Sequence, residues 1–357
     1  MIRVLHVFHE MSNGGIEHFV MNYYRHIDRT RVQFDFLVSV ETPGYFDDEI
    51  DQLGGKIYHA YPFKKNPAKS FLHIAKIVKD NGYQIIHRHT GSAFGYFDLR
   101  AAHFGGAKHL IMHSHNNQAG NLFVHVLSKY LLRIPCEKLA CSDEAGKWLF
   151  GENSKYQIIN NAISTQNFVF SLSERQKYRN LYGIGDKFVV GHVGRLENQK
   201  NHKFLLKIFK SILDKKKNSI LVLVGDGSLM EEIKNEATHL GIIENILFLG
   251  SQKETAKIYN MFDVFVLPSI YEGFGITLLE AQINGLSCFT SATVVPDTVN
   301  ITGNVKYISL KVDSEKWAEE IIQSSERKNI ALSDIKNAGF DIEKNAKQLC
   351  SYYESLI

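Results

Sequence analysis

Short apolar runs alternate along the chain with segments of helical spacing, a pattern typical of βαβ units that build a parallel sheet. In the first half the pattern predicts strands over residues 3–9, 33–40, 84–88, 110–113, 138–141 and 157–159. It predicts helices over residues 16–27, 68–80 and 122–132. The first half is therefore expected to form one α/β sheet.

The same pattern restarts near residue 187. It predicts strands over residues 187–194, 219–225, 245–249 and 264–267, and helices over 203–214, 229–240, 254–261 and 341–356. The polar stretch between the two halves suits a domain boundary. We predict one Rossmann-like domain over 1–165, a second over 166–340 and a final helix over 341–357. Two such sheets facing one another leave a central cleft.

Composition excludes several classes of protein. The 357 residues are 44% hydrophobic and 22% charged, as in ordinary globular proteins, and a net charge of +3 is too weak to indicate a nucleic-acid-binding protein. The four cysteines form no C-x-x-C pair, which argues against a zinc site and against a disulfide framework. No apolar run approaches the roughly 18 residues of a membrane span, and the N-terminus is unlike a signal peptide. We therefore expect a cytoplasmic protein.

Glycines follow three of the predicted strands. Gly14 and Gly15 follow the first strand, Gly194 follows the first strand of the second half, and Gly225 follows the next one. Each turn alone is weak evidence for a ligand site, because any α/β protein uses glycine there. Their common position at strand ends favours a ligand, since open α/β sheets bind ligands at the carboxyl ends of their strands.

The most informative segment runs from residue 268 to 285, where an apolar strand ends and an apolar helix begins. It places Glu272 in a loop and Glu280 on the helix; at about 100° per residue the two acids would not share one helical face. The free N–H groups of residues 274–277 at the start of the helix suit a phosphate. Carboxylates accept hydrogen bonds from sugar hydroxyls, so the segment indicates a nucleotide sugar. The alternative is that Glu272 only caps the helix and Glu280 is a surface acid, although its apolar neighbours make an unpaired charge awkward.

The motif Pro-Ser-x-Tyr-Glu-Gly-Phe-Gly-x-x-x-x-Glu-Ala resembles the Glu-x7-Glu signature of glycosyltransferase family 4, which are retaining enzymes of the GT-B fold. Further motifs occur in the family's order over nearly the whole chain. They are Gly14-Gly15-Ile-Glu17, His113-Ser-His115-Asn, Val193-Gly194-Arg195-Leu-Glu-Asn-Gln-Lys200-Asn201 and Val224-Gly225-Asp226-Gly227. The branch with the greatest similarity is that of bacterial exopolysaccharide and capsule transferases.

The resemblance implies a role for each matching residue. Arg195 and Lys200 would bind the diphosphate, Glu272 would contact the donor hexose near the reaction centre, and Glu280 would bind the ribose. His113 or His115 would face the donor sugar, with His115 preferred because it ends the strand. The implied catalytic set is Glu272, His115, Arg195 and Lys200. The implied donor-binding set is Gly14, Gly15, Gly194, Arg195, Lys200, Glu272, Gly273, Phe274, Gly275, Ile276, Thr277 and Glu280. His89 and His113 are candidate acceptor-binding residues.

The resemblance further implies a GT-B enzyme with an acceptor-binding first domain, a nucleotide-sugar-binding second domain and a last helix that packs back on the first. It would move a hexose from a nucleotide diphosphate sugar, UDP-linked, to a lipid-linked or glycan acceptor in surface polysaccharide synthesis, without a metal or cofactor. Two alternatives stay open: a sugar-nucleotide epimerase or hydrolase of the same fold, and a non-catalytic binding module. Residues 293–299 depart from the family's glycine-rich pattern, which leaves the donor hexose open.

Two segments suggest contact with an anionic membrane surface. Residues 121–133 place apolar residues beside Lys129 and Arg133, as in an interfacial helix, although a core helix of the first domain explains the same pattern. Lys64, Lys65 and Lys69 form the second segment, whose alternative explanation is a solvated helix entrance. The hypothesis is a peripheral enzyme at the inner face of the plasma membrane.

Overall fold

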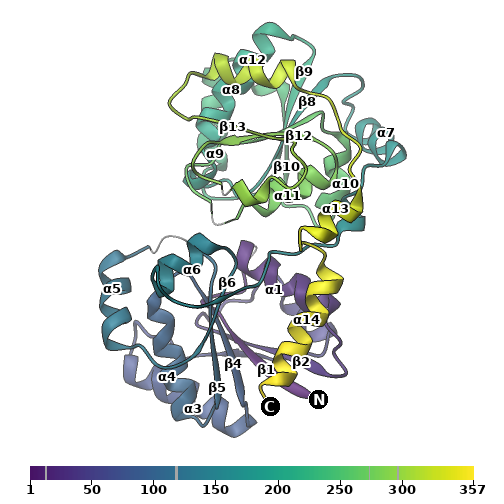
Figure 1. Ribbon diagram of the computed structural model, residues 1–357. Helices are drawn as coiled ribbons and strands as arrows, with labels where there is room; N and C mark the ends of the chain where they lie inside the picture. Colours follow the sequence, from purple (N-terminus) through teal and green to yellow (C-terminus); the bar gives the residue numbers. More distant parts are fainter. Residues whose placement is uncertain (13, 117–119, 273, 296) are drawn as a thin grey trace. The chain divides into compact units, whose positions relative to one another are not determined.

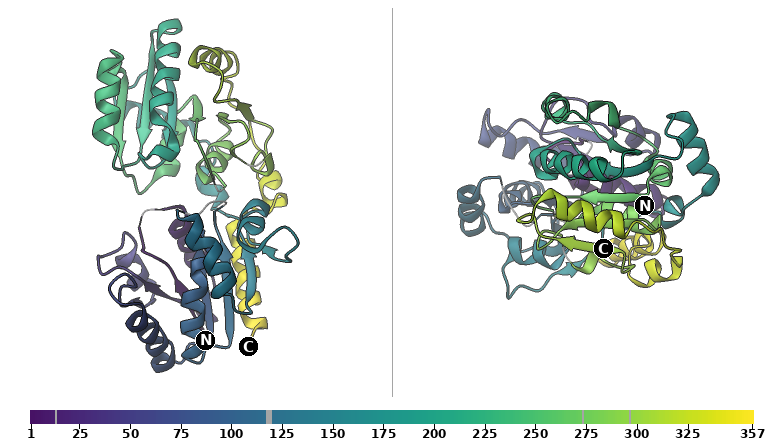
Figure 2. Two further views of the ribbon diagram at one scale, coloured as in Figure 1. Left: turned by 90° about the vertical axis from the view of Figure 1, so that its left-hand side faces the viewer. Right: turned by 90° about the horizontal axis from the view of Figure 1, so that it is seen from above.

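The computed structural model describes residues 1–12, 14–116, 120–272, 274–295 and 297–357. These residues form two compact units (Figures 1 and 2). Unit 1 comprises Met1–Ile163 and Phe340–Ile357, and unit 2 comprises Ser164–Gly339. Each unit is described by itself below.

Unit 1 is built on a seven-stranded parallel sheet with the order β3-β2-β1-β4-β5-β6-β7. The strands are β1 (Ile2–Val7), β2 (Val32–Val38), β3 (Ile57–His59), β4 (Ile85–Thr90), β5 (His109–Ser114), β6 (Glu137–Ala140) and β7 (Gln157–Ile158). All predicted strands of the first half are present, and β3 was not predicted. Its three residues are too short to give a periodic signal.

Helices cover both faces of this sheet. They are α1 (Gly15–His26), α2 (Asp47–Gln52), α3 (Pro67–Asn81), α4 (Tyr96–Phe104), α5 (Leu122–Leu131), α6 (Asp143–Phe150) and α14 (Ile342–Ser355), with the 3₁₀ turn η1 (Ala93–Gly95). One core lies between the sheet and α1 with α14, and a second lies between the sheet and α3, α4 and α6. Helix α14 comes from the far end of the chain yet packs against α1, with Ala346, Leu349 and Tyr353 on its buried face.

Local chemistry fixes where these helices begin and end. Asn66 accepts a hydrogen bond from the Lys69 backbone N–H (3.0 Å), and Pro67 occupies the first turn of α3. Gly82 ends that helix with φ 68°, a conformation that favours glycine. The carboxylate of Asp341 caps α14 in the same way by accepting from the Lys344 N–H (3.0 Å).

Unit 2 repeats the strand order of unit 1 in a six-stranded parallel sheet, β10-β9-β8-β11-β12-β13. The strands are β8 (Phe188–Val193), β9 (Ser219–Val224), β10 (Ile246–Gly250), β11 (Val264–Leu267), β12 (Ser287–Ser291) and β13 (Val305–Ile308). In both sheets the first strand of the unit lies between its second and fourth, which is the Rossmann order with its switch point. The prediction of two Rossmann-like α/β domains is confirmed.

The helices of unit 2 complete its layers. They are α7 (Leu172–Leu181), α8 (His202–Lys215), α9 (Met230–His239), α10 (Thr255–Ile258), α11 (Ile276–Ile283), α12 (Ser314–Gln323) and α13 (Leu332–Asn337). The 3₁₀ turns are η2 (Thr165–Phe168), η3 (Asn198–Lys200), η4 (Ile243–Asn245), η5 (Tyr259–Met261) and η6 (Asp297–Val299). A hydrophobic core joins α8, α9 and α12 to the sheet. It contains aliphatic residues and the aromatic residues Phe209, Phe289 and Trp317. The four cysteines of the chain are free thiols.

Candidate active site

Two loops of unit 2 meet at its switch point, where β8 and β11 lie side by side. The first loop follows β8 and contains η3; the second follows β11 and leads into α11. The backbone N–H of Ile270 donates to the carbonyl of Gln199 (2.8 Å), and the Gln199 side chain donates to the carbonyl of Tyr271 (3.0 Å). These bonds hold the two loops together, so residues far apart in the sequence form one surface.

Lys200 and Glu272 form an ion pair across these loops. The Lys200 Nζ lies 2.5 Å from Oε1 of Glu272, and the Ser269 hydroxyl donates to the same oxygen (2.6 Å). The side chains are only 14% and 6% exposed. Glu272 lies in the loop that the sequence predicted, and its carboxylate is buried and paired. The two residues predicted to be catalytic are therefore in direct contact.

Glycines make room for this pair. A Cβ on Gly194 would lie 3.2 Å from Cε of Lys200, so the lysine chain passes closely over the turn. Gly225, with φ 133°, lies against the same turn, and a Cβ there would lie 2.0 Å from the carbonyl oxygen of Gly194. Arg195 is exposed, and its guanidinium has no hydrogen-bond partner among the residues that the structure describes. A guanidinium of this kind is suited to bind a diphosphate.

The N-terminus of α11 lies on the same loop. Gly275 begins the helix with φ 79°, a left-handed conformation, and within the described ranges no side chain caps it. Phe274 is buried, Ile276 and Thr277 are half-buried, and Gly273 lies outside the described residues. The Thr277 hydroxyl is buried and meets no hydrogen-bond partner in the described part of the unit. A helix N-terminus with an unpaired hydroxyl suits an anionic oxygen.

Glu280 lies one turn further along α11 and has a protein partner. The hydroxyl of Tyr259, a fully buried residue of η5, donates to Oε2 of Glu280 (2.7 Å) and lies 3.2 Å from the Thr277 carbonyl oxygen. Burial raises the pKa of Glu280 to about 7, and the hydrogen bond from Tyr259 acts in the opposite direction. The apolar neighbours of Glu280 therefore do not leave its carboxyl group without a partner. Sequence reasoning missed Tyr259, although a tyrosine inside a predicted core helix needs a partner for its hydroxyl.

In unit 1 the loop after β1 carries Gly14 and Gly15. A Cβ on Gly14 would lie 2.4 Å from a carboxylate oxygen of Glu17, which folds back over the start of α1 and accepts from the Ser12 hydroxyl (3.4 Å). A Cβ on Gly15 would meet no described atom within 4 Å. The end of the Glu17 side chain can move aside, so packing alone does not require glycine at position 14, and Gly15 has open space beside it.

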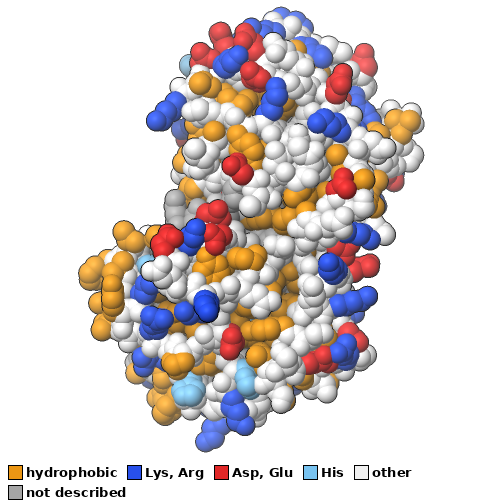
Figure 3. Space-filling model, viewed as in Figure 1, with side chains coloured by type: hydrophobic (Ala, Val, Ile, Leu, Met, Phe, Trp, Pro, Cys, Tyr) orange, Lys and Arg blue, Asp and Glu red, His pale blue; other side chains and the backbone are white. Residues whose placement is uncertain are grey.

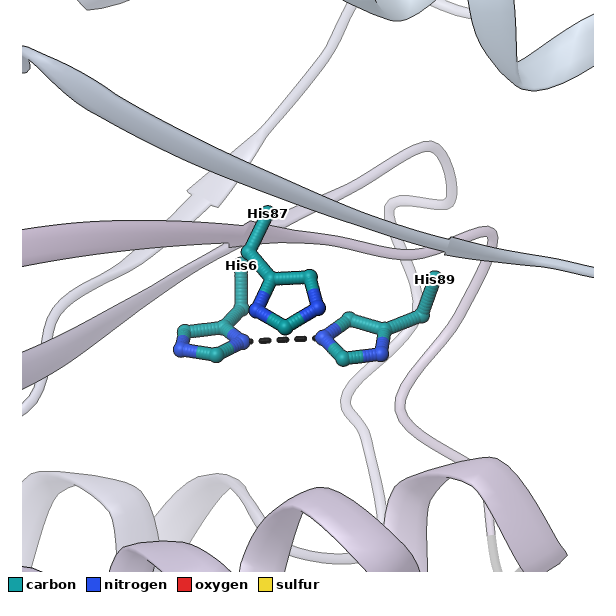
Figure 4. Close-up of side chains that lie close together, drawn as sticks. All are labelled: His6, His87 and His89. Carbon is teal, nitrogen blue, oxygen red and sulfur yellow. Dashed lines mark hydrogen bonds between the residues drawn. The ribbon is translucent and has the colours of Figure 1, made fainter. Parts of the chain in front are cut away.

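Five histidines gather on one face of the unit 1 sheet. They are His6 on β1, His87 and His89 on β4, His113 on β5 and His115 directly after it, and all five are buried. His89 bonds through Nε2 to Nδ1 of His6 (2.9 Å; Figure 4) and through Nδ1 to Nε2 of His115 (2.9 Å). His87 bonds to His113 (3.1 Å) and to the Tyr353 hydroxyl (2.6 Å). We call these five residues the histidine cluster.

The cluster changes the expected roles of its members. His89 and His113 are 2% and 0% exposed and lie under Phe19 of α1, so the structure does not support them as acceptor-binding residues. His115 is 8% exposed and stands at the carboxyl end of β5, the position preferred from the sequence. Burial lowers the pKa of His115 to about 3, so its imidazole is neutral at pH 7 and acts as a hydrogen-bonding group.

Two trios of the cluster bring ring nitrogens within 4.8 Å of one another, a spacing that a metal ion requires. Their geometry favours hydrogen bonding instead. The rings of His87 and His89 stack at 4.2 Å and 21°, and those of His113 and His115 lie 4.0 Å apart at 33°. A lone pair lies in the plane of its ring, so the stacked rings of His87 and His89 do not aim at one point, and in the other trio His89 already bonds to His115. We interpret the cluster as a network of neutral imidazoles.

In the part of the chain that the structure describes, no helix combines the length and apolar character needed to cross a membrane.

Comparison with known proteins shows the family of the chain. Residues 174–340 match the family described as Glycosyl transferases group 1. EpsF of Bacillus subtilis (strain 168), a protein named as a glycosyltransferase, is 32% identical over 98% of this chain and 96% of its own length. A UDP-Gal:alpha-D-GlcNAc-diphosphoundecaprenol alpha-1,3-galactosyltransferase of Escherichia coli is 26% identical over 81% of this chain and 80% of its own. Among solved structures, HepE of Anabaena in complex with UDP and glucose has the same fold, with a TM-score of 0.79 and 20% identity over 99% of this chain and 100% of its own.

The fold of both units, the paired loops of unit 2 and these relatives agree, and the chain belongs to the group 1 glycosyl transferases, with the GT-B type of fold.

Proposed function

We propose that this glycosyltransferase moves a hexose or hexose derivative from a UDP-linked donor to a lipid-linked or glycan acceptor, with retention of the anomeric configuration, in surface polysaccharide synthesis. The observation that carries the donor part is the Lys200–Glu272 pair beside Arg195 and the N-terminus of α11. These groups suit a sugar diphosphate, which has a negative end and a hydroxyl-rich end.

In the proposed reaction the bond between the anomeric carbon and the diphosphate oxygen breaks, and its electron pair leaves with the nucleotide. The acceptor hydroxyl oxygen forms the new bond to that carbon and gives its proton to the departing diphosphate oxygen. Charge grows on the departing diphosphate, where Arg195, Lys200 and the N–H groups at the start of α11 stabilise it. These cationic and dipolar groups take the part that a divalent metal plays in other transferases, so we propose that no metal or cofactor is required.

Glu272 would accept hydrogen bonds from hexose hydroxyls, and its contact with Lys200 supports a site in which the hexose and diphosphate contacts would lie side by side. Glu280 would accept hydrogen bonds from the ribose, held in orientation by Tyr259. Neutral His115 would hydrogen-bond the donor sugar. Gly15 would let a substrate come close to the backbone of unit 1.

Names of relatives support the donor and the acceptor classes. HepE has been crystallised with UDP and with UDP-glucose, and the Escherichia coli relative is named for a UDP-galactose donor and a diphosphoundecaprenol acceptor. CapH of Staphylococcus aureus, 23% identical over 99% of this chain, is named for capsular polysaccharide biosynthesis. An acceptor of this kind would bring the enzyme to the inner face of the plasma membrane.

The test is incubation with UDP-, GDP- and dTDP-sugars, with and without an undecaprenyl-diphosphate-linked acceptor. We expect UDP release that depends on acceptor, and a product whose anomeric coupling in NMR matches that of the donor. Equal release without acceptor would favour a hydrolase, and conversion of the donor sugar alone would favour an epimerase. Binding of the donor with neither outcome would favour a binding module.

A further inference from the structure

Helix α5 turns its apolar residues away from the protein. Phe123, Tyr130 and Leu131 are 74%, 81% and 64% exposed, whereas the polar residues His125 and Ser128 are buried. The other exposed apolar residues of the helix are Leu122, Val124, Val126 and Leu127. Figure 3 shows hydrophobic side chains on the outer surface of α5. This arrangement contradicts the core-helix explanation of the segment, since a core helix buries its apolar face.

Polar contacts hold the helix in this orientation. His125 stacks on Trp148 (4.6 Å), and its Nδ1 accepts from the backbone N–H of Ala93 in η1 (3.2 Å). Asn121 caps the first turn of α5, and Arg100 donates to the Leu132 carbonyl oxygen at its end (2.6 Å). Rotating the helix to bury its apolar residues would break the contacts of His125 with Trp148 and Ala93, whereas the Asn121 cap lies within the first turn of α5 itself. The exposed face is therefore fixed by the fold.

Basic residues flank the apolar face, and the helix itself carries no acidic residue. Lys129 lies on α5 with its Nζ 3.5 Å from the Trp148 carbonyl oxygen, and Arg133 follows the helix and is exposed. Exposed Lys64 and Lys65 follow Phe63, whose ring contacts Phe94 of η1, the turn that packs on α5. The apolar surface thus has a cationic edge.

We propose that α5 binds parallel to the surface of a bilayer containing anionic lipid, with its apolar residues in the interfacial layer and the flanking lysines and arginines at the headgroups. Ten residues of helix extend about 15 Å, which suits lying in the interface and is too short for spanning. A second copy of the chain fits less well, because a two-fold pairing of α5 would bring the cationic edges against each other. Membrane binding would bring the enzyme to the lipid-linked acceptor proposed above, and it depends on none of the donor-binding residues.

The experiment is flotation of the full chain, without substrate, with phosphatidylcholine vesicles and with vesicles that also contain phosphatidylglycerol, at low and high salt. The apolar variant is Phe123→Ser/Leu127→Ser/Tyr130→Ser. Its matched control is Leu172→Ser/Leu181→Ser, which changes exposed leucines of α7 in unit 2. The charge variant is Lys64→Glu/Lys65→Glu/Lys69→Glu, and its control exchanges the exposed lysines 215–217 for glutamate.

We expect the parent to float with the anionic vesicles and to be released at high salt. The apolar variant should bind about tenfold more weakly or worse, and each lysine should contribute on the order of fivefold, while both controls stay within twofold of the parent. A Phe123→Trp variant provides a readout that does not depend on loss of binding. Its emission should shift to the blue on anionic vesicles, whereas that of Leu172→Trp should not.

Three results would overturn the proposal: no flotation of the parent at low salt, equal flotation of parent and apolar variant, or a vesicle-free dimer that the apolar variant abolishes. Failure of donor turnover would not bear on it, because binding is measured without substrate. Conversely, loss of vesicle binding with intact transfer to a water-soluble acceptor would leave the proposed function standing.

Discussion

The two sheets share one strand order but differ in the chemistry at their switch points. In unit 1, the face beside β1 and β4 carries neutral, buried imidazoles that bond to one another. In unit 2, the loops beside β8 and β11 carry an ion pair and an exposed guanidinium. Unit 1 also has charge at its switch point, but it is the buried Arg88–Asp98 ion pair, whereas unit 2 has the exposed guanidinium of Arg195. The same topology therefore carries an exposed cation in unit 2 and a face of neutral imidazoles in unit 1.

Lowering the pH should change the folding stability of the two units by different amounts, and this is the largest difference that we expect between them. Burial lowers the pKa of His6 and His115 to about 3 and those of the other cluster members well below 6.5. Below pH 6.5 these histidines bind protons in the unfolded chain but stay neutral in the folded cluster. Unit 1 therefore loses folding stability as the pH falls, by up to about 1.4 kcal/mol per pH unit for each histidine. Hydrogen exchange of unit 1 peptides between pH 7 and 4.5 should show this loss.

Unit 2 should respond less over the same range. The pKa of Glu280 is raised to about 7, so its folded carboxyl binds a proton between pH 7 and 4.5 that the unfolded one does not, which stabilises unit 2 as pH falls. His192 and His202, with pKa values lowered to about 4 and about 2, act in the opposite direction.

The variant His6→Gln should reduce the loss of unit 1 stability per pH unit, and exposed His103→Gln should not. Equal slopes in the two units would refute the contrast.

Breaking the ion pair of unit 2 should abolish most turnover. Lys200→Ala and Glu272→Gln should each lower kcat by about 10²–10³-fold, because the pair acts where charge develops in the transition state. Each should also lower Tm, since a buried charge loses its partner. Steady-state kinetics and thermal unfolding measure the two effects.

A double variant separates catalysis from packing. Lys200→Met/Glu272→Gln should regain Tm because no buried charge is left unpaired, while kcat stays low. The exposed pair Lys203–Glu232 is the matched control, and Lys203→Met/Glu232→Gln should change neither quantity. Recovery of kcat in the first double variant would make the ion pair structural only.

Removing the charge of Glu280 should have a moderate effect. Glu280→Gln should raise the donor KM by roughly fivefold to tenfold at pH 8, where the carboxyl is ionised, and by less at pH 6, where it is largely protonated. Tyr259→Phe keeps the acid and removes only its hydroxyl partner, so its effect on KM should be smaller. A donor KM that Glu280→Gln leaves unchanged at both pH values would exclude Glu280 from ribose binding.

The sequence predicted local features well and contacts between distant strands poorly. Strand β11 has the bounds expected from its apolar run, and the Glu272 loop follows it as its glycines indicated. The Lys200–Glu272 contact joins residues 72 positions apart and depends on β8 lying beside β11. The histidine cluster likewise requires β4 to lie between β1 and β5, and nothing local encodes this order.

Helix α5 gives a different lesson. Its hydrophobic pattern fitted both a core helix and an interfacial helix, because periodicity states which residues share a face and not where that face points. The direction came from His125, which contacts Trp148 of α6 and Ala93 of η1, and from Arg100 of α4, which binds the end of α5. Polar anchors of this kind become visible only in the folded chain.

Removal of metal ions by chelation should have the smallest effect on turnover. If Arg195, Lys200 and α11 neutralise the diphosphate, turnover in EDTA should equal that in Mg²⁺ or Mn²⁺ within twofold. Complete loss of turnover in EDTA, restored by either ion, would mean that unit 2 needs a metal despite its cations.

Metal analysis of the purified protein tests unit 1. Zinc retained by the parent and lost in His89→Gln would mean that the nitrogens of the histidine cluster bind an ion. We expect neither, because the rings of the cluster stack and already bond to one another.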